Sequence, residues 1–424
     1  MPSGAAPIAE SDAVSLDNEI PPRRLIYLDW LRFLVVLLLA PFHAAISFTG
    51  SNFAYVYDEP FRATILAGHW VFDRGPALMR YMILFLDNWF MHLLFLISGI
   101  AATAALRKRS VGAFIADRVG RLLLPLVICT VTVIAVQSWL RALWLGRFSG
   151  GFISFYPRFF NRVHDSVASR GNFDWGHLWF LGYLFAFCLL LLPLMVHLKK
   201  TGAPRPQPSA ARWPASGSTM LLPCLWIGAL EAIFRPGWPG YQNLVNDWAN
   251  FTVYLSFFFF GLIAGTYRSL LERAQRMWFM MLATGLLLFI SRMAMYPLTH
   301  VHPGYSPANM AVQFLRGAAA YCLVIGVLGF AGQYMNRGTQ SIAWARNVSF
   351  PLYLLHYLPV TAATYLLLNT QFSVWTRWTI AVLASWISVA LFTRLSLLIP
   401  AFRWFFGIRI EVSNDYLPRT VEGP

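Results

Sequence analysis

The first apolar segment of the chain carries an arginine and a histidine that share one face of a helix. Arg32 and His43 lie eleven positions apart, which at 3.6 residues per turn is close to three whole turns, or roughly 16 Å along the axis. An ionisable side chain inside a membrane-length apolar segment is costly and indicates a functional site by default. A neutral imidazole can take a proton from a hydroxyl near physiological pH. This face therefore predicts a polar track that leads to a general base, His43.

Asp29 precedes Arg32 by one helical turn, and the two side chains can pair. Such a pair lowers the cost of placing an arginine at the inner membrane edge, and it is also a purely structural explanation for both residues. A lone buried histidine is more often a satisfied core residue than a catalyst. The face that His43 shares with Arg32 favours the catalytic interpretation, in which Asp29, Arg32 and His43 act together.

A second pattern, Phe114, Arg118, Arg121 and Pro125, lies at the expected cytoplasmic mouth of a later apolar segment. Arg118 and Arg121 are one helical turn apart. Two guanidinium groups on one helical face suit bidentate binding of a polyphosphate such as that of coenzyme A. The alternative is simple anchoring by positive charge on the cytoplasmic side.

Three further pieces could contact ligands. Ser98-Gly99 ends an apolar segment, where a thin ligand or a neighbouring helix could approach the backbone closely. His177 and Trp179 begin another segment, and such a pair is also a common interfacial anchor. His356 lies inside an apolar segment and is harder to explain as an anchor. We treat Ser98 as a cofactor-binding candidate and His177, Trp179 and His356 as substrate-binding candidates.

The elements that position these residues are membrane helices. The chain is 58% hydrophobic and only 12% charged, with a mean hydropathy of +0.55, whereas soluble domains are about one quarter charged. This composition excludes an ordinary soluble domain and predicts an all-α, polytopic membrane helix bundle. The net charge of +15 is explained better by basic cytoplasmic loops than by nucleic-acid binding. The four cysteines are far apart and show neither metal-ligand spacing nor a disulfide framework.

The apolar runs predict about ten transmembrane helices, which places both termini on one side of the membrane. Arginine and lysine are more frequent in the segments that are cytoplasmic when the N-terminus is inside. We therefore expect a disordered cytoplasmic tail over 1–22, a transmembrane domain over 23–400, a flexible cytoplasmic linker over 199–216 and a cytoplasmic tail over 401–424. The expected spans are 26–48, 80–106, 119–141, 177–197, 217–234, 248–267, 277–296, 309–332, 349–369 and 376–399.

Two longer outer loops, 49–79 and 142–176, mix aromatic with polar side chains, among them Tyr55 and Asp174. Long loops often carry function, and this mixture suits contacts with carbohydrate. An aromatic belt with solvated loops is an equally good explanation.

In their order along the chain, these pieces resemble the acyltransferase 3 family of membrane acyltransferases. The L-D-x-L-R segment followed by His43, and the F-x-x-x-R-x-x-R-x-x-x-P segment, look like two family signatures. The H-L-W-F-L segment at His177 and the Y-L-L-H segment at His356 are similar to further family motifs. The resemblance covers about residues 24–400. Some segments look most like members associated with succinyl substitution of periplasmic glucans, although His92 stands where a proline is expected.

The resemblance implies transfer of a succinyl or acetyl group from acyl-CoA, bound at the cytoplasmic face, to a hydroxyl of a periplasmic glucan or other glycan. Arg118 and Arg121 would hold the coenzyme A phosphates, and His43 would be the general base. Arg32, oriented by Asp29, would stabilise the thioester end or orient the pantetheine arm. Acyl-CoA is then a co-substrate, no permanently bound cofactor or metal is expected, and the protein is a multi-pass inner-membrane protein in contact with lipid. A transporter or flippase for a polar glycan or lipid explains the spans equally well, but it does not explain the arginine pair.

Overall fold

The computed structural model of the protein describes residues 25–49, 54–58, 74–163, 171–201, 218–238, 240, 242–336 and 340–399. These residues form a helix bundle, and within them the one extended pairing is an isolated bridge between Val163 and Phe173. The helices are α1 (Ile26–Leu37), α2 (Leu39–Phe48), α4 (Arg74–Asp87), α5 (Phe90–Arg107), α6 (Val111–Arg118), α7 (Leu124–Cys129), α8 (Ala135–Trp144), α9 (Phe152–Phe159), α10 (Trp179–Leu190), α11 (Leu192–Thr201), α12 (Ser218–Phe234), α13 (Trp248–Thr266), α14 (Ser269–Met295), α15 (Leu298–Val301), α16 (Pro307–Tyr334), α17 (Gln340–Leu355), α18 (Tyr357–Leu367) and α19 (Val374–Leu398).

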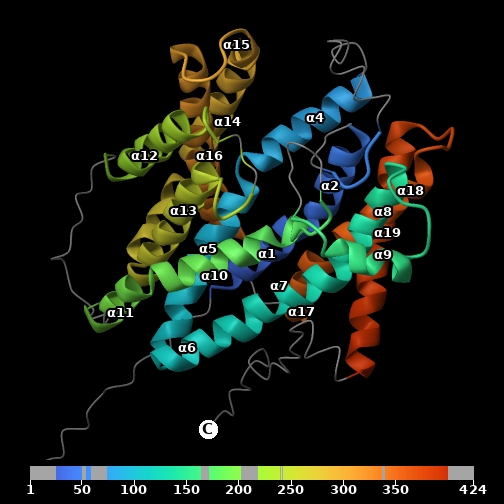
Figure 1. Ribbon diagram of the computed structural model, residues 1–424. Coiled ribbons are helices and arrows are strands. Elements are labelled where there is room, and N and C mark those ends of the chain that lie inside the picture. Colours follow the sequence, from blue (N-terminus) through green and yellow to red (C-terminus); the bar gives the residue numbers. More distant parts are fainter. Residues whose placement is uncertain are drawn as a thin grey trace, which may run out of the picture.

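The bundle has two groups of helices, which a third, central group joins. Figure 1 shows α12, α13, α14 and α16 together at one side, and α8, α9, α18 and α19 at the other. Helices α1, α5 and α10 run between the groups, and α5 packs along α13. Segments from both halves of the sequence therefore meet in the middle of the molecule.

The all-α membrane bundle is confirmed, and the predicted number of spans is close to the observed one. Seven helical segments of the described chain are long and apolar enough to cross a membrane, and two bent pairs raise the number to nine. The one remaining predicted span, 217–234, corresponds to the shorter apolar helix Met220–Phe234, which falls below the length of about 20 residues that a full crossing needs. The seven long segments are Ile26–Phe48, Ala77–Arg107, Val111–Trp144, Trp248–Thr266, Ser269–Met295, Pro307–Tyr334 and Val374–Ser396.

Prolines explain the interruptions in two spans that reach the site. Pro41 cannot donate a hydrogen bond to the carbonyl of Leu37 one turn earlier, and the indole of Trp386 on α19 donates to that carbonyl instead, at 3.3 Å. Between α17 and α18 the chain bends by 50° at His356. Pro359 follows this bend and likewise leaves the Leu355 carbonyl without its helical donor.

The close crossing of α5 and α13 depends on glycine. A methyl group added at Gly99 would overlap the carbonyl oxygen of Phe258, and one added at Gly261 would overlap that of Leu96. Small residues let two membrane helices approach in this way. The Ser98-Gly99 piece is thus part of a helix contact, the alternative considered for it from the sequence.

The predicted tails, 1–22 and 401–424, and most of the predicted linker lie outside the described residues. Three residues of that linker, Lys199, Lys200 and Thr201, instead complete α11.

The span Val111–Trp144 contains π-helical turns at Val119–Leu123 and Thr130–Ile134. Such turns are uncommon in proteins, and those that occur are frequently at functional sites. The first of them contains Arg121.

Candidate active site

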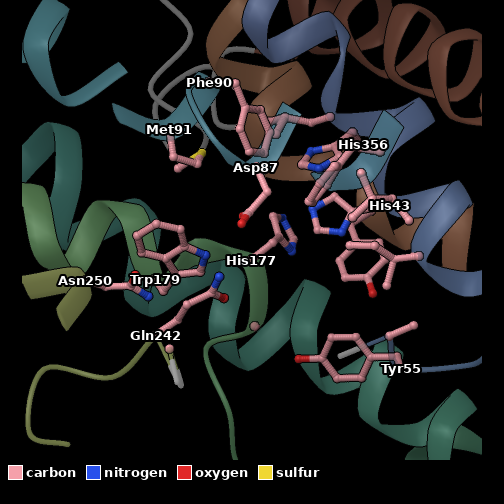
Figure 2. A pocket seen from close by; sticks show the side chains of 18 of the residues that line it. His43, Tyr55, Asp87, Phe90, Met91, His177, Trp179, Gln242, Asn250 and His356 are labelled. Carbon is pink, nitrogen blue, oxygen red and sulfur yellow. The ribbon is translucent and has the colours of Figure 1, made fainter. Parts of the chain in front are cut away.

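A cavity of about 370 Å³ opens where the two groups of helices meet. It receives side chains from α2, α4, α5, α8, α10, α13 and α16 and from the α17–α18 bend (Figure 2). Four residues singled out in the sequence line it, namely His43, His177, Trp179 and His356. Segments more than 300 positions apart, α2 and the α17–α18 bend, therefore contribute to one site.

Three histidines face one another at this cavity. The ring centroids of His177 and His356 are 4.9 Å apart, those of His43 and His356 are 5.2 Å apart, and those of His43 and His177 are 6.3 Å apart. The His43 ring also stacks on Tyr357, with 4.0 Å between centroids. Figure 2 shows the three imidazoles converging from separate ribbons. One acceptor molecule could touch all three at once.

The bend at His356 fixes the tautomer of its ring. Nδ1 lies 3.0 Å from the carbonyl oxygen of Leu352 and 2.9 Å from that of Tyr353. A carbonyl oxygen only accepts, so Nδ1 carries the hydrogen and Nε2 of the neutral ring keeps its lone pair. Nε2 is buried and has no hydrogen-bond partner among the described residues. The ring thus offers a bare acceptor at the site.

His177 presents a second ring nitrogen without a hydrogen-bond partner, but here Nε2 is the bonded nitrogen and Nδ1 the bare one. Its Nε2 donates to the carbonyl oxygen of Leu354 at 3.1 Å, so Nδ1 keeps the lone pair. This Nδ1 is also buried without a partner in the described part of the chain. The hydroxyl of Tyr353 donates to the His177 carbonyl at 2.8 Å. His177 is therefore held by groups of the segment that carries His356, whereas the His356 ring is held by carbonyls of its own helix.

Parts of the two predicted outer loops meet at the rim. Tyr55 donates to Asp174 at 3.2 Å, and Asp174 also accepts from the backbone N–H of Gly176 at 3.1 Å. Burial, and then the adjacent Asp174 carboxylate, raise the pKa of the Tyr55 hydroxyl well above its usual range. Tyr55 therefore stays a neutral donor. The guanidinium of Arg141 lies over its ring, 5.4 Å from the centroid.

The lining of the cavity also contains a set of compensated charges, which were not predicted from the sequence as part of the site. Arg235 donates to both carboxylate oxygens of Glu231, at 2.7 and 2.9 Å, and to Asn250 at 2.8 Å. Arg316 donates to Asp87 at 3.1 Å. Asp87, Arg235, Asn250 and Arg316 all line the cavity. The signal was available for Arg316 and Glu231, because each is an ionisable residue inside an apolar segment.

The predicted arginine clamp forms a separate cluster. Asp117 accepts from Arg118 at 2.7 Å, lies 2.9 Å from Nε of Arg121, and is 3.7 Å from a guanidinium nitrogen of Arg109. The Arg118 guanidinium also lies over the ring of Phe114, 5.0 Å from its centroid. One carboxylate thus gathers three guanidinium groups, which leaves the cluster with excess positive charge.

The remaining predicted residues lie outside the cavity. Arg32 pairs with Asp29 at 3.8 Å, as the i, i+3 spacing predicts, and its side chain is 40% exposed. None of Asp29, Arg32, Ser98, Arg118 and Arg121 is among the residues that line the cavity. Arg32, at the start of the predicted polar track, therefore does not line the same cavity as His43.

Among the described residues, no group of three His, Cys, Asp or Glu side chains is arranged to hold a metal ion.

Comparison with known proteins identifies the family of the chain. No curated protein and no solved structure matches the chain. A family model, Acyl_transf_3, described as an acyltransferase domain, matches residues 25–396. This range includes all the helices described above, apart from the last two residues of α19, and all three histidines of the cavity. The chain belongs to the acyltransferase 3 family and is a membrane acyltransferase that transfers groups other than aminoacyl groups.

Proposed function

We propose that this enzyme moves a succinyl or acetyl group from acyl-CoA to a hydroxyl of an extracytoplasmic glycan, such as a glucan, at the histidine-lined cavity. The observation that carries the proposal is the convergence of His43, His177 and His356 on one cavity, with two imidazole nitrogens bare and buried. Buried polar atoms are normally hydrogen-bonded. Two such atoms facing a cavity are therefore suited to a ligand that brings donors, and hydroxyl groups are donors.

In this mechanism His43 is the general base. It accepts the proton of one acceptor hydroxyl as that oxygen attacks the thioester carbonyl, and the new C–O bond replaces the C–S bond. The coenzyme A thiolate leaves and takes up the proton, so the products are an ester and free coenzyme A. Nδ1 of His177 and Nε2 of His356 accept hydrogen bonds from neighbouring hydroxyls, and Trp179 offers an apolar edge to the sugar. These contacts would hold the acceptor beside His43.

The donor is held at the Asp117 cluster. Asp117 holds Arg118 and Arg121 in place. Guanidinium groups bind phosphate oxygens in a bidentate way, so the excess positive charge of this cluster suits a polyphosphate. The pantetheine arm then reaches from this cluster into the bundle, where Arg32, oriented by Asp29, steadies the thioester end.

The acceptor and the acyl group follow from the likeness of several segments to glucans biosynthesis protein C. This likeness supports a glucan acceptor and a succinyl donor, with acetyl as the other choice. The orientation that fits is a multi-pass inner-membrane protein whose termini face the cytoplasm, where acyl-CoA is made.

The test uses the purified full-length protein in lipid nanodiscs. Succinyl-CoA or acetyl-CoA is added with β-linked glucose oligosaccharides, and free coenzyme A thiol is measured beside the mass of the oligosaccharide. We expect thiol release that depends on the oligosaccharide, together with a mass increase of one acyl group. Release without any modified sugar would contradict the glycan acceptor, and no release with either donor would favour transport.

A further inference from the structure

One residue of the cavity has a backbone conformation that its side chain disfavours. Gln242 has φ = +56°, and every other described residue with positive φ is a glycine. The left-handed region is unfavourable for residues with a Cβ atom, and glycine takes it without this cost. Non-glycine residues in this region are concentrated at functional sites, where the surrounding structure imposes the conformation.

Two side chains impose the conformation here. The carboxylate of Asp247 accepts the backbone N–H of Gln242 at 2.6 Å, and the indole of Trp175 donates to its carbonyl at 3.2 Å. Asp247 is held in turn by Asn250, at 2.9 Å, and by the hydroxyl of Tyr183, at 3.3 Å. The Gln242 backbone is therefore fixed by contacts with α10, α13 and the segment that precedes α10.

The side chain explains why this position holds glutamine. Gln242 lines the cavity, and Figure 2 shows its amide directed into it, on the same side as Trp179. Within the described ranges no hydrogen bond of this amide is found, whereas the amide of Asn250 is used by Arg235 and Asp247. A strained backbone thus presents an amide that is available to a ligand.

The chemistry of the surrounding wall indicates the ligand. Arg235 is matched by Glu231 and Arg316 by Asp87, so much of the charge on this wall is already compensated. Asp87 also points into the cavity (Figure 2) and keeps lone pairs beyond its contact with Arg316. An amide, which both donates and accepts, and a carboxylate, which accepts, suit the hydroxyls of an uncharged saccharide.

We propose that Gln242 is a specificity-determining residue that binds hydroxyl groups of the saccharide acceptor at this cavity. This inference rests on the proposed function and assigns one contact within it. It separates acceptor binding at Gln242 from the chemistry at His43.

The experiment compares three variants of the full-length enzyme, with succinyl-CoA or acetyl-CoA as donor and β-linked glucose oligosaccharides as acceptor. Gln242→Gly removes the amide and relieves the backbone, Gln242→Asn keeps a shorter amide and tolerates positive φ, and Asn246→Ala is the control. Asn246 is exposed on the same loop and does not line the cavity. KM for the oligosaccharide, kcat, KM for the donor and Tm are measured for each.

We expect Gln242→Gly to raise KM for the oligosaccharide roughly three- to tenfold, with kcat and donor KM nearly unchanged and Tm equal to or above that of the wild type. Gln242→Asn should lie between the two, and Asn246→Ala should match the wild type. An unchanged acceptor KM in Gln242→Gly would overturn the proposal. So would a loss of activity that follows a lower Tm, because the side chain would then be structural. Wild-type enzyme that modifies no oligosaccharide would refute the proposed function itself, and this proposal with it.

Discussion

Replacing His43 by glutamine tests the proposed base most directly. Glutamine is of similar length and forms hydrogen bonds, but it cannot take up a proton near neutral pH. The His43 ring stacks on Tyr357, with 4.0 Å between centroids, and lies edge-on to Phe42 at 5.3 Å. A second variant, His43→Phe, keeps an aromatic ring in these contacts and also lacks a base. Together the two variants separate proton transfer from packing.

The two effects differ greatly in size. An aromatic pair contributes about 0.5–1.5 kcal/mol beyond the burial of its area, so losing the Tyr357 stack lowers stability by a modest fraction of the total. A general base contributes about 10²–10⁴-fold in rate, which corresponds to roughly 2.7–5.4 kcal/mol of activation free energy. A loss of kcat in that range, in a protein that still melts cooperatively, cannot come from the lost stack.

The assay measures kcat by thiol release, coenzyme A binding by equilibrium titration, and Tm for each purified variant. We expect His43→Gln and His43→Phe to lose at least about 100-fold in kcat and to bind coenzyme A like the wild type, since neither Arg118 nor Arg121 lines the cavity. A folded His43→Gln protein with kcat within tenfold of the wild type would refute the role of His43. A lower Tm that accounts for the loss of activity would instead identify His43 as a structural core residue.

Three further predictions test other parts of the protein. Arg118→Ala or Arg121→Ala should weaken coenzyme A binding by about 1.5–3 kcal/mol each. Lysine at either position should restore binding only in part, because lysine lacks the planar guanidinium fork. If titration shows unchanged affinity in both alanine variants, the pair serves only to anchor the topology. A cysteine placed at Ser209 in otherwise cysteine-free protein should resist membrane-impermeant reagents added to intact cells, and strong labelling would reverse the proposed orientation. Gly99→Ala should destabilise the α5–α13 contact by roughly 1–3 kcal/mol, measured as a lower Tm, whereas Gly112→Ala, which meets no atom within 4 Å, should not.

The sequence predicted the helices well because their signal is local. Long apolar runs locate membrane helices without knowledge of their neighbours, and nine of the ten expected spans correspond to long segments or bent pairs. The bend at His356 also has a local signal, Pro359, which was not used. The shorter apolar helix Met220–Phe234 lacks the length of a full crossing, which is why the expected span 217–234 has no long counterpart among the described residues.

The candidate site was predictable in part, one residue at a time. His43, His177, Trp179 and His356 were each selected from the sequence, but their meeting at one cavity depends on how α2, α10 and the α17–α18 bend pack. Gln242 could not be selected, because its backbone conformation is set by Asp247 and Trp175 through tertiary contacts. Nothing in its own segment marks it.

The separation of the arginine cluster from the cavity has a physical consequence for the proposed reaction. Phosphates are costly to move into the apolar interior of a bundle, and the Asp117 cluster gives them partners outside the cavity. Only the thin pantetheine arm then has to pass between the helices to reach His43. In the proposed reaction a hydroxyl-rich acceptor would meet polar groups at the cavity, among them Gln242, Asp87 and the bare imidazole nitrogens. Neither substrate has to cross the membrane whole, so an acyltransferase built in this way needs no opening wide enough to leak.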